Sequence, residues 1–254
     1  MRRLWGMLLA ASLVAASLVA AMFVAPAWAQ DRRQNEPGKF DYYVLALSWS
    51  PSFCEQAGDR KSAQQQCGAR PFSFVVHGLW PQYERGFPEF CQQPAPFIES
   101  PIINGMLDLM PARQLVIHEW RKHGVCAGLP ARGYFETIRK ARAGVKIPEE
   151  FLEPKTALTV SPDEVEDAFV KANPGLSRGG VAVTCSSTHL SEVRICLSRD
   201  LKFRDCQEID RRACRRERLV MPPVRGGERL PHPEEPPKRL TDEVRLRAKA
   251  VREG

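Results

Sequence analysis

The sequence has 254 residues, of which 43% are hydrophobic and 26% are charged, and its formal net charge at pH 7 is +7. This length is enough for one domain with a sizeable core. The positive excess favours a polyanionic partner through Coulomb attraction. This positive excess is small, and a basic surface can also serve solubility alone. Net charge by itself therefore assigns no function.

The N-terminal segment, residues 1–29, has the pattern of a secretory signal peptide. Two arginines precede an uncharged apolar run over residues 4–28, which closes on the small-x-small triplet Ala-Trp-Ala. The run is also long enough for an uncleaved membrane anchor. We expect cleavage after Ala29. The exported chain, periplasmic or extracellular, would then carry 35 basic and 30 acidic residues, a net charge of +5, without stable membrane association.

All eight cysteines follow this segment, and an even number in an oxidising compartment predicts four disulfides. A zinc site is the alternative, but no Cys-x-x-Cys spacing occurs, so we expect no metal and no cofactor. The cysteines are Cys54, Cys67, Cys91, Cys126, Cys185, Cys196, Cys206 and Cys214.

The first predicted elements in chain order are two strands. Residues 39–50 contain a β-prone apolar run that Pro51 stops, and residues 72–77 form a second run. We expect His77 at the end of this second strand, where the following turn leaves its side chain open to a cleft.

A helix is predicted over residues 111–123, which begin with proline and reach a glycine without an internal breaker. At about 100° per residue, the polar side chains share one side of this helix, and Ile117 and Trp120 lie away from them. The polar side carries His118, Glu119, Lys122 and His123.

The later elements are two more helices and a hairpin. A helix is predicted over residues 133–143, and another over residues 161–172 begins with a Ser-x-x-Glu capping box. Alternating residues predict a hairpin over 180–203 with its bend near 187–191. These elements predict an α+β domain with a mainly antiparallel central sheet, several packed helices and disulfides.

The C-terminal segment is rich in Arg, Glu and Pro and has no aromatic residue. Such a segment buries too little apolar surface to offset its ordering entropy, so residues 218–254 are predicted to be disordered, apart from a short helix near 242–251. Its arginines could contact a polyanion, although a solvated tail is the simpler interpretation. The predicted organisation is therefore a signal peptide of residues 1–29, a folded domain of residues 30–217 and this tail.

Three of the five histidines lie in two short runs, residues 74–81 and 118–126, beside a carboxylate and a lysine. Imidazole has an ordinary pKa of about 6.5, so two of them flanking one phosphodiester could supply a base and an acid. A cation and hydrogen-bond donors would stabilise the crowded transition state. His77 alone could equally be a buried, hydrogen-bonded histidine, but the second run makes phosphoryl transfer the better interpretation.

A zinc hydrolase is the competing enzymatic interpretation, because His-Glu begins the second run. Zinc-binding helices of that kind use His-Glu-x-x-His, with imidazoles four residues apart. Here His118 and His123 are five residues apart, and Lys122 stands where a ligand is needed. A protonated lysine there would repel the metal.

The runs Phe-Val-Val-His-Gly-Leu-Trp-Pro of residues 74–81 and His-Glu-Trp-Arg-Lys-His-Gly-Val-Cys of residues 118–126 resemble the two signature segments of the ribonuclease T2 family. Further agreement comes from Leu-Ser-Trp-Ser-Pro-Ser-Phe-Cys of residues 47–54. The similarity covers residues 40–214, and the paired motifs are highly specific.

The resemblance implies a metal-independent endoribonuclease that cleaves single-stranded RNA, with low base specificity, through a 2′,3′-cyclic phosphate to 3′-phosphate ends. By motif position, His123 is expected to be the general base for the 2′-hydroxyl and His77 the general acid for the departing 5′-oxygen. His118 is expected to hold the phosphate, and Glu119 and Lys122 to stabilise the transition state. The residues alone do not decide which histidine is the acid and which is the base.

The resemblance also implies a base-binding pocket, in which Trp80 stacks on a base and Gln82 and Tyr83 supply polar contacts. Core packing is the alternative for Trp80. Trp49 and Trp120 are expected to be structural, because one ends a predicted strand and the other faces away from the polar side of the helix.

The disulfide pairing implied by the resemblance would hold the loop after His77 to the end of the second signature segment. Spacing alone leaves the pairing open. The expected pairs are Cys54 with Cys67, Cys91 with Cys126, Cys185 with Cys214, and Cys196 with Cys206.

A hypothesis from another class is an inactive RNA- or polyanion-binding protein on the same scaffold. A binder requires charge but not an acid and base pair, so the intact set of histidines argues against it. We therefore expect a monomeric enzyme whose partner is single-stranded RNA.

Overall fold

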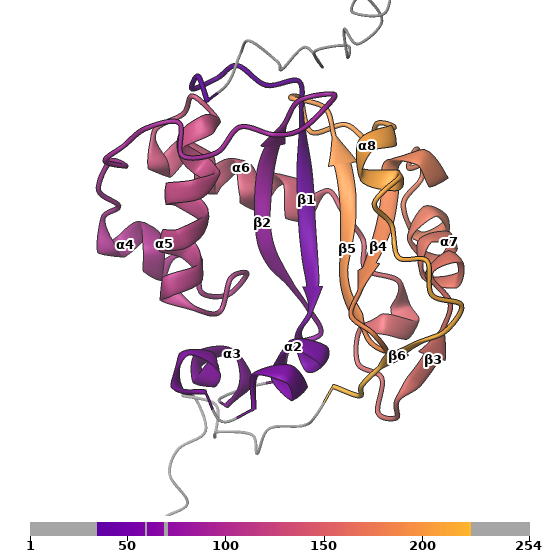
Figure 1. Cartoon of the computed structure of the whole chain (residues 1–254). Helices are drawn as coiled ribbons and strands as arrows, with labels where there is room; N and C mark the ends of the chain where they lie inside the picture. The colour runs from indigo at the N-terminus through magenta and orange to yellow at the C-terminus, as the bar shows by residue number, and fades with distance from the viewer. Residues whose placement is uncertain (1–34, 59, 69–70, 225–254) are drawn as a thin grey trace, which may run out of the picture. The chain divides into compact units, whose positions relative to one another are not determined.

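The computed structural model describes residues 35–58, 60–68 and 71–224, so the predicted signal peptide lies outside the described residues. A four-stranded antiparallel sheet in the order β2-β1-β5-β4 forms the centre of this part of the chain (Figure 1). β4 and β5 are the predicted hairpin, and the predicted α+β class is confirmed. The strands are β1 (Tyr42–Trp49), β2 (Phe74–Gln82), β4 (Val181–Cys185) and β5 (Leu190–Leu197).

Helices pack against the two outer strands of the sheet, α5 and α6 against β2 and α7 against β4, and α6 also runs behind the inner strand β1 (Figure 1). The predicted helix after Pro111 is α5 (Arg113–Lys122), and α6 (Ala131–Ala143) begins two residues earlier than predicted. α7 (Pro162–Ala172) starts with the predicted capping box. None of the helices that the structure describes is both long and apolar enough to cross a membrane. The shorter helical segments are α2 (Ser50–Ala57), η1 (Lys61–Ala63), α3 (Gln64–Cys67), α4 (Ser100–Asn104), η2 (Gly124–Cys126), η3 (Glu149–Phe151), η4 (Arg178–Gly180) and α8 (Gln207–Asp210).

The two faces of the sheet carry different side chains, because successive residues of a strand point to opposite faces. Leu45, Leu47 and Trp49 of β1 are fully buried in the main core, which α5, α6 and α7 complete. Tyr42 and Val44 point to the other face, where a smaller apolar cluster lies against α8. The main core thus occupies one face and leaves the other for polar side chains of the central strands.

His77 lies in the middle of β2, so the prediction that it ends the strand was wrong. Ala46 of β1 pairs with Gly78, and the next β1 residue pairs with Val76. His77 is therefore an extra residue without a partner on β1, a β-bulge, which bends a strand and re-aims its side chain. Gly-Leu-Trp-Pro has the composition of a turn, but pairing with β1 continues to Gln82 because the tertiary ladder overrides local propensity.

The folded unit continues past the predicted start of the tail. β6 (Leu219–Met221) pairs with β3 (Leu158–Val160), and its two end residues are buried. The predictions of a boundary at 217 and of disorder were therefore wrong for residues 218–224, since a short apolar run there closes a second sheet. Residues 225–254, with the predicted short helix, lie outside the described residues.

All four disulfide pairs implied by the resemblance are confirmed. The bond between Cys91 and Cys126 joins the loop after β2 to η2, the short helical segment that follows α5. The remaining pairs join α3 to α2, and the segment around α8 to β4 and β5. The disulfides therefore fasten the elements that surround the central strands.

Candidate active site

The polar side of α5 faces β2, while its apolar side packs in the core, as the helical wheel predicted. Trp120 is 2% exposed and donates from Nε1 to the carbonyl of Pro96 at 2.8 Å. Trp49 is fully buried and donates to the carbonyl of Pro222 at 3.1 Å. Both tryptophans are structural, as predicted, because their rings are buried and their single donors are used.

Glu119 reaches from α5 to the backbone of β2 at Gly78. A Cβ at Gly78 would overlap Glu119 Oε2 and Trp80 Nε1, which form a hydrogen bond of 2.7 Å. The other oxygen, Oε1, lies 3.6 Å from His77 Nε2. Burial raises the pKa of Glu119, although the His77 charge and the Trp80 hydrogen bond oppose this shift. The bulged strand and the helix thus meet at one carboxylate.

His77 is held from its other side by Glu192 of β5. Its Nδ1 lies 2.5 Å from Glu192 Oε1. Burial lowers the pKa of His77, but the hydrogen bond and charge of Glu192, together with the charge of Glu119, outweigh it and raise the pKa above 6.5. The surroundings of His77 therefore favour its protonated form.

His123 follows the last residue of α5 and is 7% exposed. Its ring lies 5.4 Å from that of Trp80, centroid to centroid, and its Nδ1 has no hydrogen-bond partner among the described residues. Burial, with the charges of Lys122, His77 and His118, lowers the pKa of His123 to about 3. His123 is therefore neutral near pH 7 and able to accept a proton.

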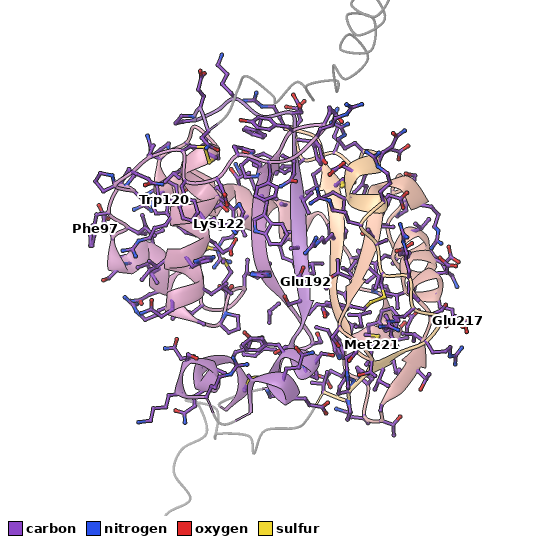
Figure 2. All side chains as sticks on the ribbon, in the orientation of Figure 1. Phe97, Trp120, Lys122, Glu192, Glu217 and Met221 are labelled. Carbon is purple, nitrogen blue, oxygen red and sulfur yellow. A yellow bond between two sulfur atoms is a disulfide. The ribbon has the colours of Figure 1, made fainter. Side chains whose placement is uncertain are left out.

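His118 and Lys122 complete the group on α5. His118 is exposed, and burial of part of its ring, with the charges of Lys122 and His77, lowers its pKa. Lys122 is half-buried, and its Nζ lies 3.8 Å from Glu89 Oε2. Figure 2 shows Lys122 and Glu192 entering from α5 and β5, with β2 and β1 between them. The five predicted catalytic residues therefore lie on one side of α5 and at the facing bulge of β2.

Of the three residues predicted to bind a base, only Trp80 lies among these side chains. Its ring contacts those of His77 and His123, at 5.3 and 5.4 Å between centroids. Gln82 and Tyr83 are 5% and 3% exposed, and Gln82 donates to the neighbouring Pro81 carbonyl. Both side chains are therefore buried, and the amide of Gln82 is bonded to the adjacent backbone.

Sequence reasoning missed two residues at this group, Glu192 and Phe87. Phe87 is 41% exposed, and its ring centroid lies 6.3 Å from that of His123. Phe87 lies in a Gly-Phe-Pro loop, where no helical or strand periodicity indicates which way a side chain faces. Glu192 is 8% exposed, and its alternation with apolar neighbours in the predicted strand could have marked it as a buried charge needing a partner.

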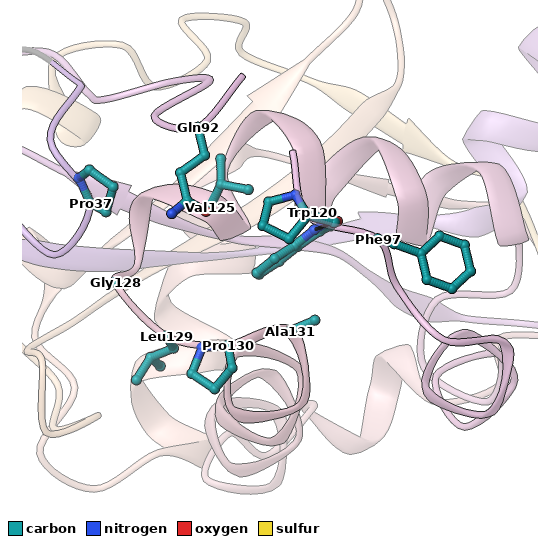
Figure 3. A pocket seen from close by; sticks show the side chains of 10 residues that line it. Pro37, Gln92, Phe97, Trp120, Val125, Gly128, Leu129, Pro130 and Ala131 are labelled. Atoms are coloured by element: carbon teal, nitrogen blue, oxygen red, sulfur yellow. Dashed lines mark hydrogen bonds between the residues drawn. The ribbon is translucent and has the colours of Figure 1, made fainter. Parts of the chain in front are cut away.

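A cavity of about 480 Å³ is lined by Trp120 of α5, Leu129 and Phe97 among others (Figure 3), and its lining includes none of the site histidines. Phe97 at its rim is 86% exposed.

The described part of the chain contains no group of three or more His, Cys, Asp or Glu side chains arranged to hold a metal ion.

Comparison with known proteins agrees with this geometry. The model of the ribonuclease T2 family matches residues 40–206. The chain belongs to this family. It is 34% identical over 172 residues to a ribonuclease of Aeromonas hydrophila, covering 66% of this chain and 76% of that protein. It is also 34% identical over 186 residues to a "probable ribonuclease" of Haemophilus influenzae, covering 68% of this chain and 64%, just under two thirds, of that relative.

Solved structures show the same fold. RNase NT, crystallised in complex with 5′-AMP, superimposes with a TM-score of 0.61 at 24% identity, covering 72% of this chain and 98% of that one. An RNase-related protein from Calystegia sepium superimposes with a TM-score of 0.60 at 20% identity, covering 73% and 98%. This ribonuclease T2 chain therefore has the fold of its family, with the signature histidines brought together at the bulge of β2.

Proposed function

We propose that the protein is an endoribonuclease that cleaves single-stranded RNA by transphosphorylation, without a metal or cofactor. The observation that carries this proposal is geometric: the rings of His77 and His123, from two separate segments, both lie against Trp80, and Glu119 of α5 reaches His77 Nε2 at 3.6 Å. The electrostatic surroundings of the two histidines agree with it. Burial lowers the pKa of His123 to about 3, whereas Glu192 and Glu119 overcome burial and raise that of His77. Neighbouring groups with opposed pKa values are suited to act as a base and an acid.

In the proposed reaction, His123 takes the proton from the ribose 2′-hydroxyl as the 2′-oxygen attacks phosphorus. The bond from phosphorus to the 5′-oxygen breaks, and His77 protonates that oxygen from Nε2. Lys122 and His118 stabilise the negative charge on the phosphoryl oxygens, and Glu119 acts by hydrogen bonding. Hydrolysis of the resulting 2′,3′-cyclic phosphate, with the two histidines in exchanged roles, leaves a 3′-phosphate.

Low base specificity is proposed from the aromatic character of the site. Trp80 and the exposed ring of Phe87 flank His123, and aromatic faces bind unpaired bases largely irrespective of identity. Gln82 and Tyr83 would contribute to recognition only if a bound base exposed them, since both are buried.

Incubation of the purified protein with single-stranded RNA in EDTA, followed by analysis of the product ends, tests this function. Cyclic-phosphate ends are expected. Intact RNA that migrates as a complex would indicate the inactive binder, and cleavage that EDTA abolishes would indicate a zinc hydrolase.

Alanine at His77 or at His123 should each lower kcat by about 10²–10⁴-fold, since each removes one proton-transfer group. His189→Ala is the matched control, because His189 Nε2 contacts Glu55 Oε2 at 3.4 Å rather than the site. Near-normal turnover in either site variant would remove that residue from the mechanism.

We also propose that the protein is exported as a monomer after loss of residues 1–29. Four disulfides support an oxidising compartment. Sequencing of the N-terminus of the protein recovered from the cell envelope or medium should begin at Gln30, and light scattering should give the monomer mass.

A further inference from the structure

Glu192 reaches His77 across an intervening strand. β5, which carries Glu192, pairs with β1, and β1 pairs with β2, which carries His77. The β1 residue opposite Glu192 is Ser48, whose short side chain leaves room for the carboxylate and donates to its Oε1 at 3.3 Å. The bulge at His77 turns the imidazole to meet this carboxylate at 2.5 Å. The contact thus depends on three strands.

The carboxylate of Glu192 is fixed on its second oxygen as well. Arg194 donates to Glu192 Oε2 from Nε at 3.0 Å and from Nη2 at 2.8 Å. The guanidinium of Arg194 also lies 5.2 Å from the ring centroid of Trp80. A carboxylate with both oxygens bound and 8% exposure has little freedom to turn, so it can impose an orientation on His77.

The two ring nitrogens of His77 consequently have different surroundings. Nδ1 faces Glu192, whose Oε1 accepts a hydrogen bond from Nδ1–H, and Nε2 faces Glu119 Oε1 at 3.6 Å. A histidine whose Nδ1–H is held by a carboxylate presents Nε2 to its reaction partner. We propose that Glu192 is the positioning residue of His77, which orients the imidazole so that Nε2 carries the proton delivered to the leaving 5′-oxygen. This inference rests on the proposed function and adds to it a residue outside both signature segments.

The negative charge of Glu192 supports the same role of His77 as the orientation that Glu192 imposes. Without Glu192, burial and Arg194 would favour the neutral form of His77, and only the charge of Glu119 would oppose them. Glu192 therefore also favours the protonated form of His77, whereas burial favours the neutral form of His123. The charged and titratable groups that face His77 are Glu192 and Arg194 of β5, Glu119 and His118 of α5, and His123 at the end of that helix.

Glu192→Gln separates the two effects, because the amide oxygen can still accept from Nδ1–H but carries no charge. We expect kcat at neutral pH to fall about 10-fold, and about 100-fold in Glu192→Ala, within the range that a general acid contributes. KM should change less than twofold. The alkaline limb of the rate profile should move to lower pH, and the imidazole pKa of His77, followed by NMR, should fall.

Glu208→Gln is the matched control, since Glu208 is also a partly buried carboxylate held by two arginines, Arg211 and Arg212, away from the histidines. It should leave the rate and the His77 titration unchanged. In a His77→Ala background, adding Glu192→Gln should cost nothing more, because Glu192 acts through His77.

Glu192→Asp provides a variant that retains the charge, should Glu192→Gln fold poorly. Its carboxylate is one methylene shorter and should lower kcat by an intermediate factor. If wild-type protein cleaves RNA and these variants retain its rate, its pH profile and its His77 pKa, the positioning role is refuted while the function stands. If wild-type protein is inactive, the function fails, and an unchanged His77 pKa in the variants would refute the role of Glu192 independently.

Discussion

At the scale of single residues, the contact between α5 and β2 depends on Gly78. The absence of a Cβ there lets Glu119 Oε2 approach the strand and accept the hydrogen bond of Trp80. The same carboxylate lies within 3.6 Å of His77 Nε2. A glycine in a strand interior commonly marks such a close approach. Here it allows a helix carboxylate to reach the proposed acid.

Gly78→Ala should lower kcat about 100-fold, because the added Cβ displaces Glu119 and Trp80 and small misplacements in a site have effects of this size. Steady-state RNA cleavage measures the loss, with disulfide content and thermal unfolding as checks on folding. Gly133→Ala in α6 is the control, since its Cβ would make only ordinary contacts of 3.7 Å. Equal activity of both variants with wild type would argue against this role of Gly78.

The pH dependence of cleavage is also decided by individual residues. A general base works above its pKa, and a general acid below its own. kcat/KM should therefore rise with pH through the pKa of His123, which burial lowers below 6.5, and fall through that of His77, which Glu192 raises above 6.5. The profile of the wild-type enzyme against a dinucleotide, recorded while circular dichroism reports folding, should be bell-shaped. A rising limb centred above pH 6.5 would contradict the assignment of His123 as base.

At the scale of elements, the loop after β2 is attached at two points, to the last residue of α5 and to η2, which follows it. Cys91 and Cys126 form a disulfide, and the amide of Phe90 donates to the carbonyl of Lys122 at 2.8 Å. This loop carries Phe87, whose ring lies beside His123. These two links thus keep the ring of Phe87 close to α5, the helix that carries three polar side chains of the site.

Replacing Cys91 and Cys126 together by serine should cost about 3–4 kcal/mol of stability, the loop-closure value for a separation of 35 residues, and should also raise KM for RNA. Removing Cys54 and Cys67, separated by 13 residues, should cost about 3 kcal/mol with little change in KM, because that bond joins α2 and α3, which carry none of the proposed site residues. Urea unfolding and steady-state kinetics measure the two effects. Unchanged KM in the first variant would show that the loop does not need this tether.

At the scale of the whole described molecule, the C-terminal end of the folded unit closes against its first strand. Trp49, the last residue of β1, donates to the carbonyl of Pro222. Leu219 and Met221 are 1% and 0% exposed in the main core. Residues after the last cysteine therefore belong to the domain on which the site is built.

Truncation after residue 217 should destabilise the protein by at least about 3 kcal/mol, because it exposes the partners of Leu219 and Met221 and leaves the indole N–H of Trp49 without its acceptor. Truncation after Val224 should leave the unfolding midpoint within a few degrees of that of the full chain. Thermal unfolding of both truncated chains makes the comparison. Equal midpoints would show that β6 contributes nothing.

Much of the fold could be predicted because its signals are local. The helix α5 follows from an uninterrupted run between a proline and a glycine, and the hairpin of β4 and β5 follows from alternation. The position of His77 could not be predicted, because a bulge arises from pairing with β1, a strand nearly thirty residues away. The contact between His77 and Glu192 could not be predicted either, because the two residues are 115 positions apart in the chain.

The amino-acid sequence by itself determined the family, the number of disulfides and the residues of the two signature runs. Motif spacing and cysteine count can be read directly from the chain. Only the tertiary structure decided which nitrogen of His77 is held, why its pKa rises while that of His123 falls, and where the domain ends. The pKa of a side chain depends on its burial and on the charges around it, and these come from several strands and helices. A local stretch of sequence does not show which of these elements will surround it.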